Sequence, residues 1–209
     1  VHGVQYLLIQ DNVAYQTMGH TFFIEDGAET KNSLIGNLAI KTKRSWSLLN
    51  TDQTPASFWI THPDNTFRNN HAAGSDRYGF WFDLQTHPGG PSSSTAVCPE
   101  FEKLGEFSGN VAHSNGRYGL RLFHRFIPVT DPCAALAEGK FGSRLEHTSA
   151  TNPHINTEFT DFTGYKNKRT AIIAEELGAL KFKNIKVADN LMSGVEFGIT
   201  SVGPWLTAS

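Results

Sequence analysis

The 209-residue sequence lacks the features of several common protein classes. No apolar run approaches 18 residues, so no membrane-spanning helix is expected, and no succession of charged, apolar and small residues indicates a signal peptide. No Asn-x-Ser/Thr sequence is present, so N-glycosylation is not expected. Neither sign of charge dominates, since the formal net charge is −2. Fifteen Phe and four Trp nevertheless supply enough apolar material for one continuous core.

Basic residues are dispersed apart from two short groups. Neither group has the extent of a nucleic-acid footprint, and no nucleic-acid partner is predicted. We interpret both groups as solvated turns, with contact to an anionic glycan as the alternative. The first group is Lys41, Lys43 and Arg44, and the second is Lys166, Lys168 and Arg169.

Cysteine is scarce, with only Cys98 and Cys133, and each lies in a Pro-containing segment. We predict a disulfide between two loops that leave the same edge of the fold, worth about 3–4 kcal/mol in the chain-entropy model. Such a bond indicates an oxidising compartment, and two free thiols are the alternative. The paired Cys and His spacing of a zinc site is missing, so no metal site of this kind is predicted.

The sequence contains an internal repeat. Four times an apolar residue is followed by Asn three places later and by Ala five places later. Because the intervals between copies vary, a helical array of constant length is excluded and a solenoid with inserted loops is favoured. Further apolar starts are expected near Phe162 and at Phe182. The four copies are Ile9/Asn12/Ala14, Leu34/Asn37/Ala39, Phe67/Asn70/Ala72 and Phe107/Asn110/Ala112.

The repeat predicts strands joined by corners. Apolar residues alternate after Gly79, Gly119 and Gly194, which indicates strands, and Asn12, Asn37, Asn70 and Asn110 at equivalent positions predict a ladder of stacked amides. We therefore predict an all-β, right-handed parallel β-helix of PbH1-type repeats that forms one segment over residues 1–209. Inserted loops are expected at about 84–105 and 124–160. A β-sandwich would not explain the fixed offsets, and residues 171–177 suit either a short helix or a strand.

Three segments resemble a known family. They are GHTFFIEDGAETKNSLIGNLA at 19–39, ASFWITHPDNTFRNNHAAGSDRYGFWF at 56–82 and EFSGNVAHSNGRYGL at 106–120. Together they are similar to the parallel β-helix region of the fibrocystin family, fibrocystin-L-like members above all. That group also includes cell-surface hyaluronidases and the cell migration-inducing, hyaluronan-binding protein. The resemblance covers roughly residues 1–135, and residues 136–209 resemble only generic β-helix rungs.

The resemblance implies an extracellular module, at the cell surface or secreted, beside immunoglobulin-like and G8 domains. The chain begins Val-His-Gly and shows no polar capping segment, so we expect a larger polypeptide to continue on both sides. The expected function is a non-catalytic structural and adhesive module of a surface coat or matrix, with extracellular glycan or other coat proteins as partners. The alternatives are a glycan hydrolase of the hyaluronidase type and a carbohydrate-binding module.

Glycan hydrolysis would need two carboxyl groups about 5–5.5 Å or about 6.5–9.5 Å apart. Stacked rungs lie roughly 4.8 Å apart, so carboxylates one or two rungs apart would meet either requirement. The same acidic residues also suit turns or rim ion pairs, and Glu25, Asp26 and Glu29 would offer calcium only a weak site without known loop spacing. The catalytic candidates are Glu25, Asp26, Asp76 and Asp83, with His20 and His113 for proton transfer.

Strand alternation also predicts a ligand-binding position. If Phe80 and Phe82 fill the core, Trp81 lies outside the coil, with Arg121 beside it and Glu196 as the third member of the column. An outward Trp on a flat face would suit a glycan or protein. The alternative is that the loop 84–105 covers it.

Overall fold

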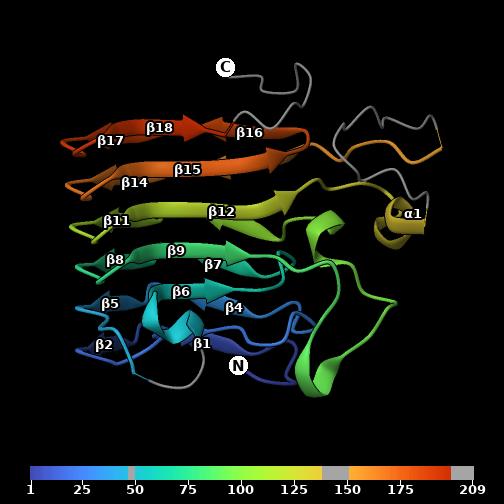
Figure 1. The fold of residues 1–209 in the computed structure, drawn as a ribbon, viewed down its shortest axis with the longest axis horizontal. Helices are drawn as coiled ribbons and strands as arrows, with labels where there is room; N and C mark the ends of the chain where they lie inside the picture. Colours follow the sequence, from blue (N-terminus) through green and yellow to red (C-terminus); the bar gives the residue numbers. More distant parts are fainter. Residues whose placement is uncertain (47–49, 138–150, 199–209) are drawn as a thin grey trace.

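Each turn of the coil contributes one strand to each of three parallel sheets, which makes the chain a right-handed parallel β-helix (Figure 1). The computed structural model describes residues 1–46, 50–137 and 151–198. Six rungs stack along the coil, and every pairing between rungs is parallel. The predicted fold is confirmed. Within the described ranges, no helix has the length and apolar character needed to cross a bilayer.

The strands follow one another from sheet to sheet in each rung. The first sheet contains β1 (Leu8–Gln10), β4 (Ser33–Ile35), β7 (Thr66–Arg68), β10 (Glu106–Ser108), β13 (Thr157–Thr160) and β16 (Leu180–Lys183). The second contains β2 (Val13–Tyr15), β5 (Leu38–Ile40), β8 (His71–Ala73), β11 (Val111–His113), β14 (Thr163–Tyr165) and β17 (Lys186–Ala188). The third contains β3 (Phe22–Phe23), β6 (Ala56–Ile60), β9 (Tyr78–Asp83), β12 (Tyr118–Phe126), β15 (Thr170–Leu177) and β18 (Ser193–Phe197).

Three connections leave the coil after strands of the second or third sheet. Residues 84–105 join β9 to β10 and contain the 3-10 helices η2 (Gly90–Ser92) and η3 (Pro99–Phe101). The connection before β13 spans residues 127–156 rather than 124–160, because β12 continues to Phe126 and β13 begins at Thr157. It contains α1 (Pro132–Ala137). A third connection, 41–55 with η1 (Asn50–Gln53), was not predicted. Residues 171–177 lie in strand β15 and not in a helix.

The core is a stack of aromatic rings inside the coil. Phe22, Phe58 and Phe80 lie one above another, with ring centroids 4.9 and 4.6 Å apart. Phe159 packs 5.3 Å from Phe107 and continues the apolar column of the repeat. The fifth copy therefore starts at Phe159 and not near Phe162 as predicted. Each such buried ring stabilises the fold by about 1.5–3 kcal/mol.

The predicted amide ladder runs through the first four rungs. The Asn37 amide group donates to the Asn70 Oδ1 at 3.1 Å, and that of Asn70 donates to Asn110 Oδ1 at 3.2 Å. Each Oδ1 also accepts the backbone N–H of the preceding ladder residue. The ladder stops where Phe162 precedes β14, because a ring has no amide to offer the next rung.

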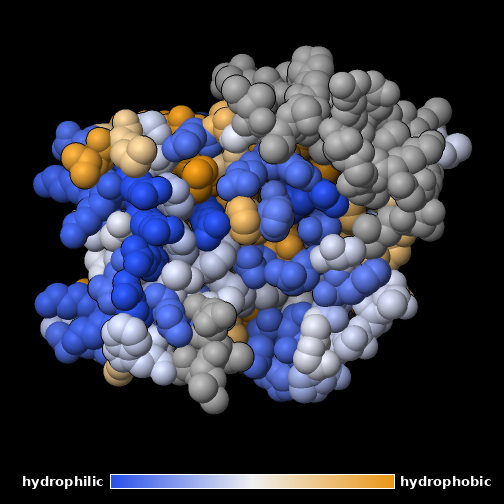
Figure 2. Space-filling model, viewed as in Figure 1, coloured by the Kyte–Doolittle hydropathy of each residue, from blue (hydrophilic) through white to orange (hydrophobic). Residues whose placement is uncertain are grey.

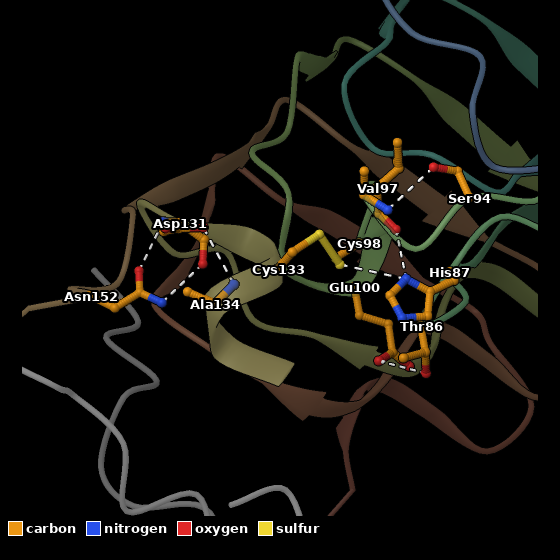
Figure 3. Close-up of a disulfide and its surroundings, with 11 residues drawn as sticks. Thr86, His87, Ser94, Val97, Cys98, Glu100, Asp131, Cys133, Ala134 and Asn152 are labelled. Atoms are coloured by element: carbon orange, nitrogen blue, oxygen red, sulfur yellow. Dashed lines mark hydrogen bonds between the residues drawn. A yellow bond between two sulfur atoms is a disulfide. The ribbon is translucent and has the colours of Figure 1, made fainter. Parts of the chain in front are cut away.

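Cys98 and Cys133 form the predicted disulfide, which joins the residue preceding η3 to α1 (Figure 3). The disulfide packs into a small buried cluster, apart from the main core, that includes Cys98, Phe101 and Val129. The Asn152 side chain also holds this loop, since its Oδ1 accepts the Asp131 N–H at 2.8 Å and its amide donates to the Asp131 carbonyl at 2.9 Å. The two longest insertions are thus tied to each other outside the coil.

Candidate functional site: a basic corner of the coil

The turns from the second sheet into the third bring the two basic groups to one corner of the coil. These turns lie at the left of Figure 1. Backbone hydrogen bonds link each turn to the turn on the preceding rung. Asp76 N–H donates to Thr42 O at 2.9 Å. Gly116 N–H donates to Ser75 O at 2.7 Å, and Lys168 N–H donates to Asn115 O at 2.9 Å. Residues 41–44 of the second rung and 166–169 of the fifth therefore occupy equivalent positions.

Arginines on the intervening rungs join the two groups into one row. Arg117 N–H donates to the Arg77 carbonyl at 2.7 Å, and Arg169 N–H donates to the Arg117 carbonyl at 3.0 Å, which places the three residues on successive rungs. Burial, followed by the charges of Arg117 and Arg44, lowers the pKa of Arg77. We name Arg44, Arg77, Arg117 and Arg169 the arginine row, and the row with the flanking lysines 41, 43, 166 and 168 the basic corner. Figure 2 shows hydrophilic side chains gathered along this edge.

A second amide ladder holds the corner in place. Asn115 donates through its side chain to Asn167 Oδ1 at 2.9 Å, and Asn167 donates likewise to Asn190 Oδ1 at 2.9 Å. Both Asn115 and Asn167 are buried, so their neighbours in sequence are directed outward. The spacing Asn115-x-Arg117 recurs as Asn167-x-Arg169, a signal present in the sequence but not used to predict this ladder.

Gly116 lets the rungs approach closely at this corner. A Cβ atom at this position would lie 2.0 Å from the carbonyl oxygen of Asp76, a separation that no side chain can tolerate. Asp76 itself, a predicted catalytic residue, accepts the backbone N–H of Arg44 at 2.8 Å through its carboxylate. Asp76 therefore organises the turn below the arginine row, and Gly116 takes the position above it.

The arginine row has no carboxylate ion pair among the residues that the structure describes. Two of its guanidinium groups meet tyrosine hydroxyls: Arg117 donates to Tyr78 Oη at 3.5 Å and Arg169 to Tyr118 Oη at 3.4 Å. The Arg44 guanidinium carbon lies 5.8 Å from the ring centroid of the exposed Trp46. A neutral hydroxyl orients a guanidinium group without compensating its charge. Asp76 is the carboxylate whose charge acts on Arg77, and four arginines with their flanking lysines outnumber it. The excess of positive charge creates a potential that attracts anions.

Trp81 lies beside the corner on the outer face of the third sheet, as predicted, but its ring is covered. Only 6% of the residue is exposed. The Arg121 guanidinium carbon lies 4.5 Å from the Trp81 ring centroid, and the Trp59 and Tyr78 rings pack 4.7 Å away. A ligand would reach the indole face only after these groups moved. Arg121 pairs with Trp81 across adjacent strands, whereas Ile173 separates Arg121 from Glu196.

The acidic candidates of the N-terminal region divide into two environments. The Glu25 carboxylate lies 2.8 Å from His2 Nδ1, and together with Asp26 they form a group whose ligand atoms lie within 4.8 Å of one another. Glu29 is buried instead and accepts the backbone N–H groups of Gly3, Gly27 and Ala28. The predicted set of Glu25, Asp26 and Glu29 is therefore not assembled as one site, and His2 joins the first two.

The remaining catalytic candidates are dispersed over the coil. His20 is buried against Trp59, and burial lowers its pKa to about 4 despite Asp52 nearby. His113 lies on the second sheet, where its ring stacks on Tyr165 and burial lowers its pKa. At the end of β9, burial raises the pKa of Asp83 to about 6, and its carboxylate accepts a hydrogen bond from Gln85 at 2.9 Å.

Comparison with known proteins gives a consistent set of relatives. A family model described as the CEMIP beta-helix matches residues 1–120. Human fibrocystin-L is 36% identical over 197 residues, which cover 94% of this chain and 4% of that protein. The human cell surface hyaluronidase CEMIP2 is 39% identical over 162 residues, or 65% of this chain and 12% of the relative. The mouse cell migration-inducing and hyaluronan-binding protein is 30% identical over 201 residues, or 80% and 15%.

These matches define how far the similarity extends. An alignment of 197 residues necessarily passes residue 135, where the family resemblance was expected to end, so it includes rungs beyond that point. The chain spans only a small part of each relative's length, 4% for fibrocystin-L.

Proposed function

This chain belongs to the CEMIP β-helix family, and from that premise we propose that it is a non-catalytic adhesive module of an extracellular coat or matrix protein, which binds an acidic glycan at the basic corner. The arginine row is the observation on which the proposal depends. The guanidinium groups of four arginines on neighbouring rungs form no ion pair with a carboxylate among the described residues, and guanidinium groups bind carboxylates in bidentate geometry.

The relatives and the disulfide support this proposal. One relative is named a hyaluronan-binding protein and another a cell surface hyaluronidase, so acidic glycan is the ligand class that both names share. The Cys98–Cys133 disulfide suits an oxidising compartment, where such glycans are found. The rigid, amide-laddered corner fixes the backbone of the site before a ligand arrives, which lowers the entropic cost of binding.

An adhesive function suits the corner better than hydrolysis does. A glycosidase site needs two carboxyl groups at a defined separation around the bound sugar. Asp76 is the only predicted catalytic carboxylate at the corner, and its counterpart on the next rung is Gly116. A chain held along the arginine row would therefore meet cations and hydroxyl groups rather than an acid–base pair.

Two observations favour hydrolysis of the same glycan class as a second candidate function. Glu25 and Asp26 lie close together beside His2, and Asp83 has a pKa of about 6, which suits a residue that protonates a leaving group. These groups lie outside the basic corner. Hydrolysis would thus depend on different residues from glycan binding, and variants separate the two functions.

The test incubates the 209-residue chain with hyaluronan and measures both bound protein and chain length, with calcium or with a chelator. We expect saturable binding without shortened chains. Binding should weaken in the variant Arg117→Gln/Arg169→Gln and persist in Lys103→Gln, which removes one exposed charge outside the basic corner. Shortened hyaluronan that disappears in Glu25→Gln or Asp83→Asn would replace the adhesive proposal with the hydrolase.

A further inference from the structure

The positive charges of the basic corner form a line with a short and regular repeat. Arg77, Arg117 and Arg169 follow one another rung by rung, and Arg44 extends the line to the second rung. Neighbouring parallel strands lie about 4.8 Å apart, so the backbone positions that hold these arginines repeat about every 4.8 Å parallel to the coil axis. Lysines 41 and 43 flank one end and lysines 166 and 168 flank the other.

This density of charge discriminates between acidic glycans. Hyaluronan has one carboxylate for each disaccharide, whereas sulfated glycans add sulfate groups on the same sugars. The positive charge of an arginine on every rung is compensated more fully by a chain with several anionic groups per disaccharide than by a chain with one. From this match we propose that the basic corner prefers a sulfated glycan, laid parallel to the coil axis, over hyaluronan. The inference rests on the proposed function and defines its ligand class more narrowly.

The unbound corner contains repulsion that a densely charged ligand relieves. Burial lowers the pKa of Arg77 most, the charges of Arg117 and Arg44 on the neighbouring rungs lower it further, and Asp76 opposes them. The tyrosine hydroxyls keep the side chains of Arg117 and Arg169 in the row rather than letting them diverge into solvent. Sulfate oxygens match the planar donor geometry of a guanidinium group. A bound sulfated chain would therefore occupy the unused N–H donors of the arginine row and reduce the repulsion between its charges.

A nucleic acid is the other linear polyanion with closely spaced charges, and two observations disfavour it. Single-stranded nucleic acid is bound through exposed aromatic rings on which bases stack. Beside the row, Tyr78 is 1% and Tyr118 is 8% exposed, so neither offers a ring face to a base. The corner also has two exposed rings, Trp46 and Tyr15, but the cations of Arg44 and Lys41 lie over them, each 5.8 Å from the ring centroid. The disulfide also favours an oxidising compartment such as the extracellular space over the cytosol and nucleus.

The test compares four ligands on the immobilised 209-residue chain. They are a heparin oligosaccharide, the same oligosaccharide after desulfation, hyaluronan of equal sugar number, and single-stranded DNA of equal charge. The sulfated chain should bind at least about tenfold more tightly than hyaluronan, the difference expected for one additional charge-assisted contact. The preference should decline steeply with salt, because closely spaced charges release counterions on binding.

Variants assign the preference to the arginine row. The triple variant Arg77→Gln/Arg117→Gln/Arg169→Gln should lose the preference for sulfate, and Lys103→Gln should retain it. If the triple variant fails to fold by circular dichroism, the exposed Lys168→Gln provides the second measurement and should reduce sulfated-chain binding selectively.

Each contrary result has a distinct meaning. Equal or tighter binding of hyaluronan would overturn the sulfate preference and leave the proposed glycan adhesion in place. Absence of binding to every glycan would overturn both. Equal affinity for the DNA would overturn the assignment of the ligand to sulfated glycans, because the corner would then bind any polyanion with closely spaced charges.

Discussion

The amide ladder makes a quantitative prediction through Asn70. Its side chain is fully buried and makes four hydrogen bonds. Its Oδ1 accepts the N–H and the amide group of Asn37, and its Nδ2 donates to Leu34 O at 2.8 Å and to Asn110 Oδ1. Asn70→Ala removes all four bonds and keeps the backbone of the corner.

The magnitude follows from the groups left without a partner. The Asn37 N–H and the Leu34 carbonyl lose the side-chain partners they have in the native ladder. Each buried group left unsatisfied costs about 1–3 kcal/mol, so Asn70→Ala should lower the free energy of unfolding by about 2–6 kcal/mol. A domain of ordinary stability, about 5–15 kcal/mol, would lose a large part of it.

Asn12→Ala is the matched control. Asn12 is exposed at the start of the same ladder and donates to Gln10 O and Asn37 Oδ1. Because solvent can replace these bonds, the loss should stay within about 0.5 kcal/mol. Urea unfolding followed by circular dichroism measures both variants, and equal m-values are needed for a valid comparison. Equal losses at the two positions would refute the view that burial makes the ladder stabilising.

Three further predictions concern charge, redox state and pH. Arg117→Gln should raise the thermal stability at low ionic strength, because it relieves repulsion within the arginine row, and high salt should remove the gain; a loss at both salt concentrations would contradict this. Reducing the Cys98–Cys133 disulfide should lower the free energy of unfolding by about 3–4 kcal/mol, measured with and without reductant, and an unchanged transition would show that the two insertions do not contribute to the cooperative unit. Burial raises the folded-state pKa of Asp83 from 3.8 to about 6, so the folded protein binds the proton more tightly and the contribution of this group to stability should fall as pH rises from about 4 to about 6. Asp83→Asn should abolish that part of the pH dependence, and an unaltered pH profile would contradict the assignment.

The sequence predicted the elements of the fold that repeat. The offsets from Phe67 to Asn70 and Ala72 identify one corner, because a corner imposes the same requirement on every rung. The fifth rung was misplaced by three residues, since Phe162 takes the ladder position that Asn occupies in earlier rungs. Tertiary packing, which accepts a ring in this position, outweighs the local pattern there.

The candidate site was harder to predict because it depends on stacking across the inserted loops. The groups at 41–44 and 166–169 looked like separate solvated turns, and only the pairing of rungs places them at the same corner as Arg77 and Arg117. The outward direction of Trp81 followed from strand alternation. Strand alternation could not predict that Arg121 covers the Trp81 ring, because alternation determines the face of a side chain and not what packs on it.

Footprinting the arginines with a dicarbonyl reagent, with and without an acidic oligosaccharide, tests the central claim most directly. Arg117 and Arg169 should be protected by the ligand, whereas Arg68, which pairs with Glu106 on the first sheet, should react equally in both samples. Unchanged modification of Arg117 and Arg169 in the presence of saturating ligand would contradict the assignment of glycan binding to the basic corner.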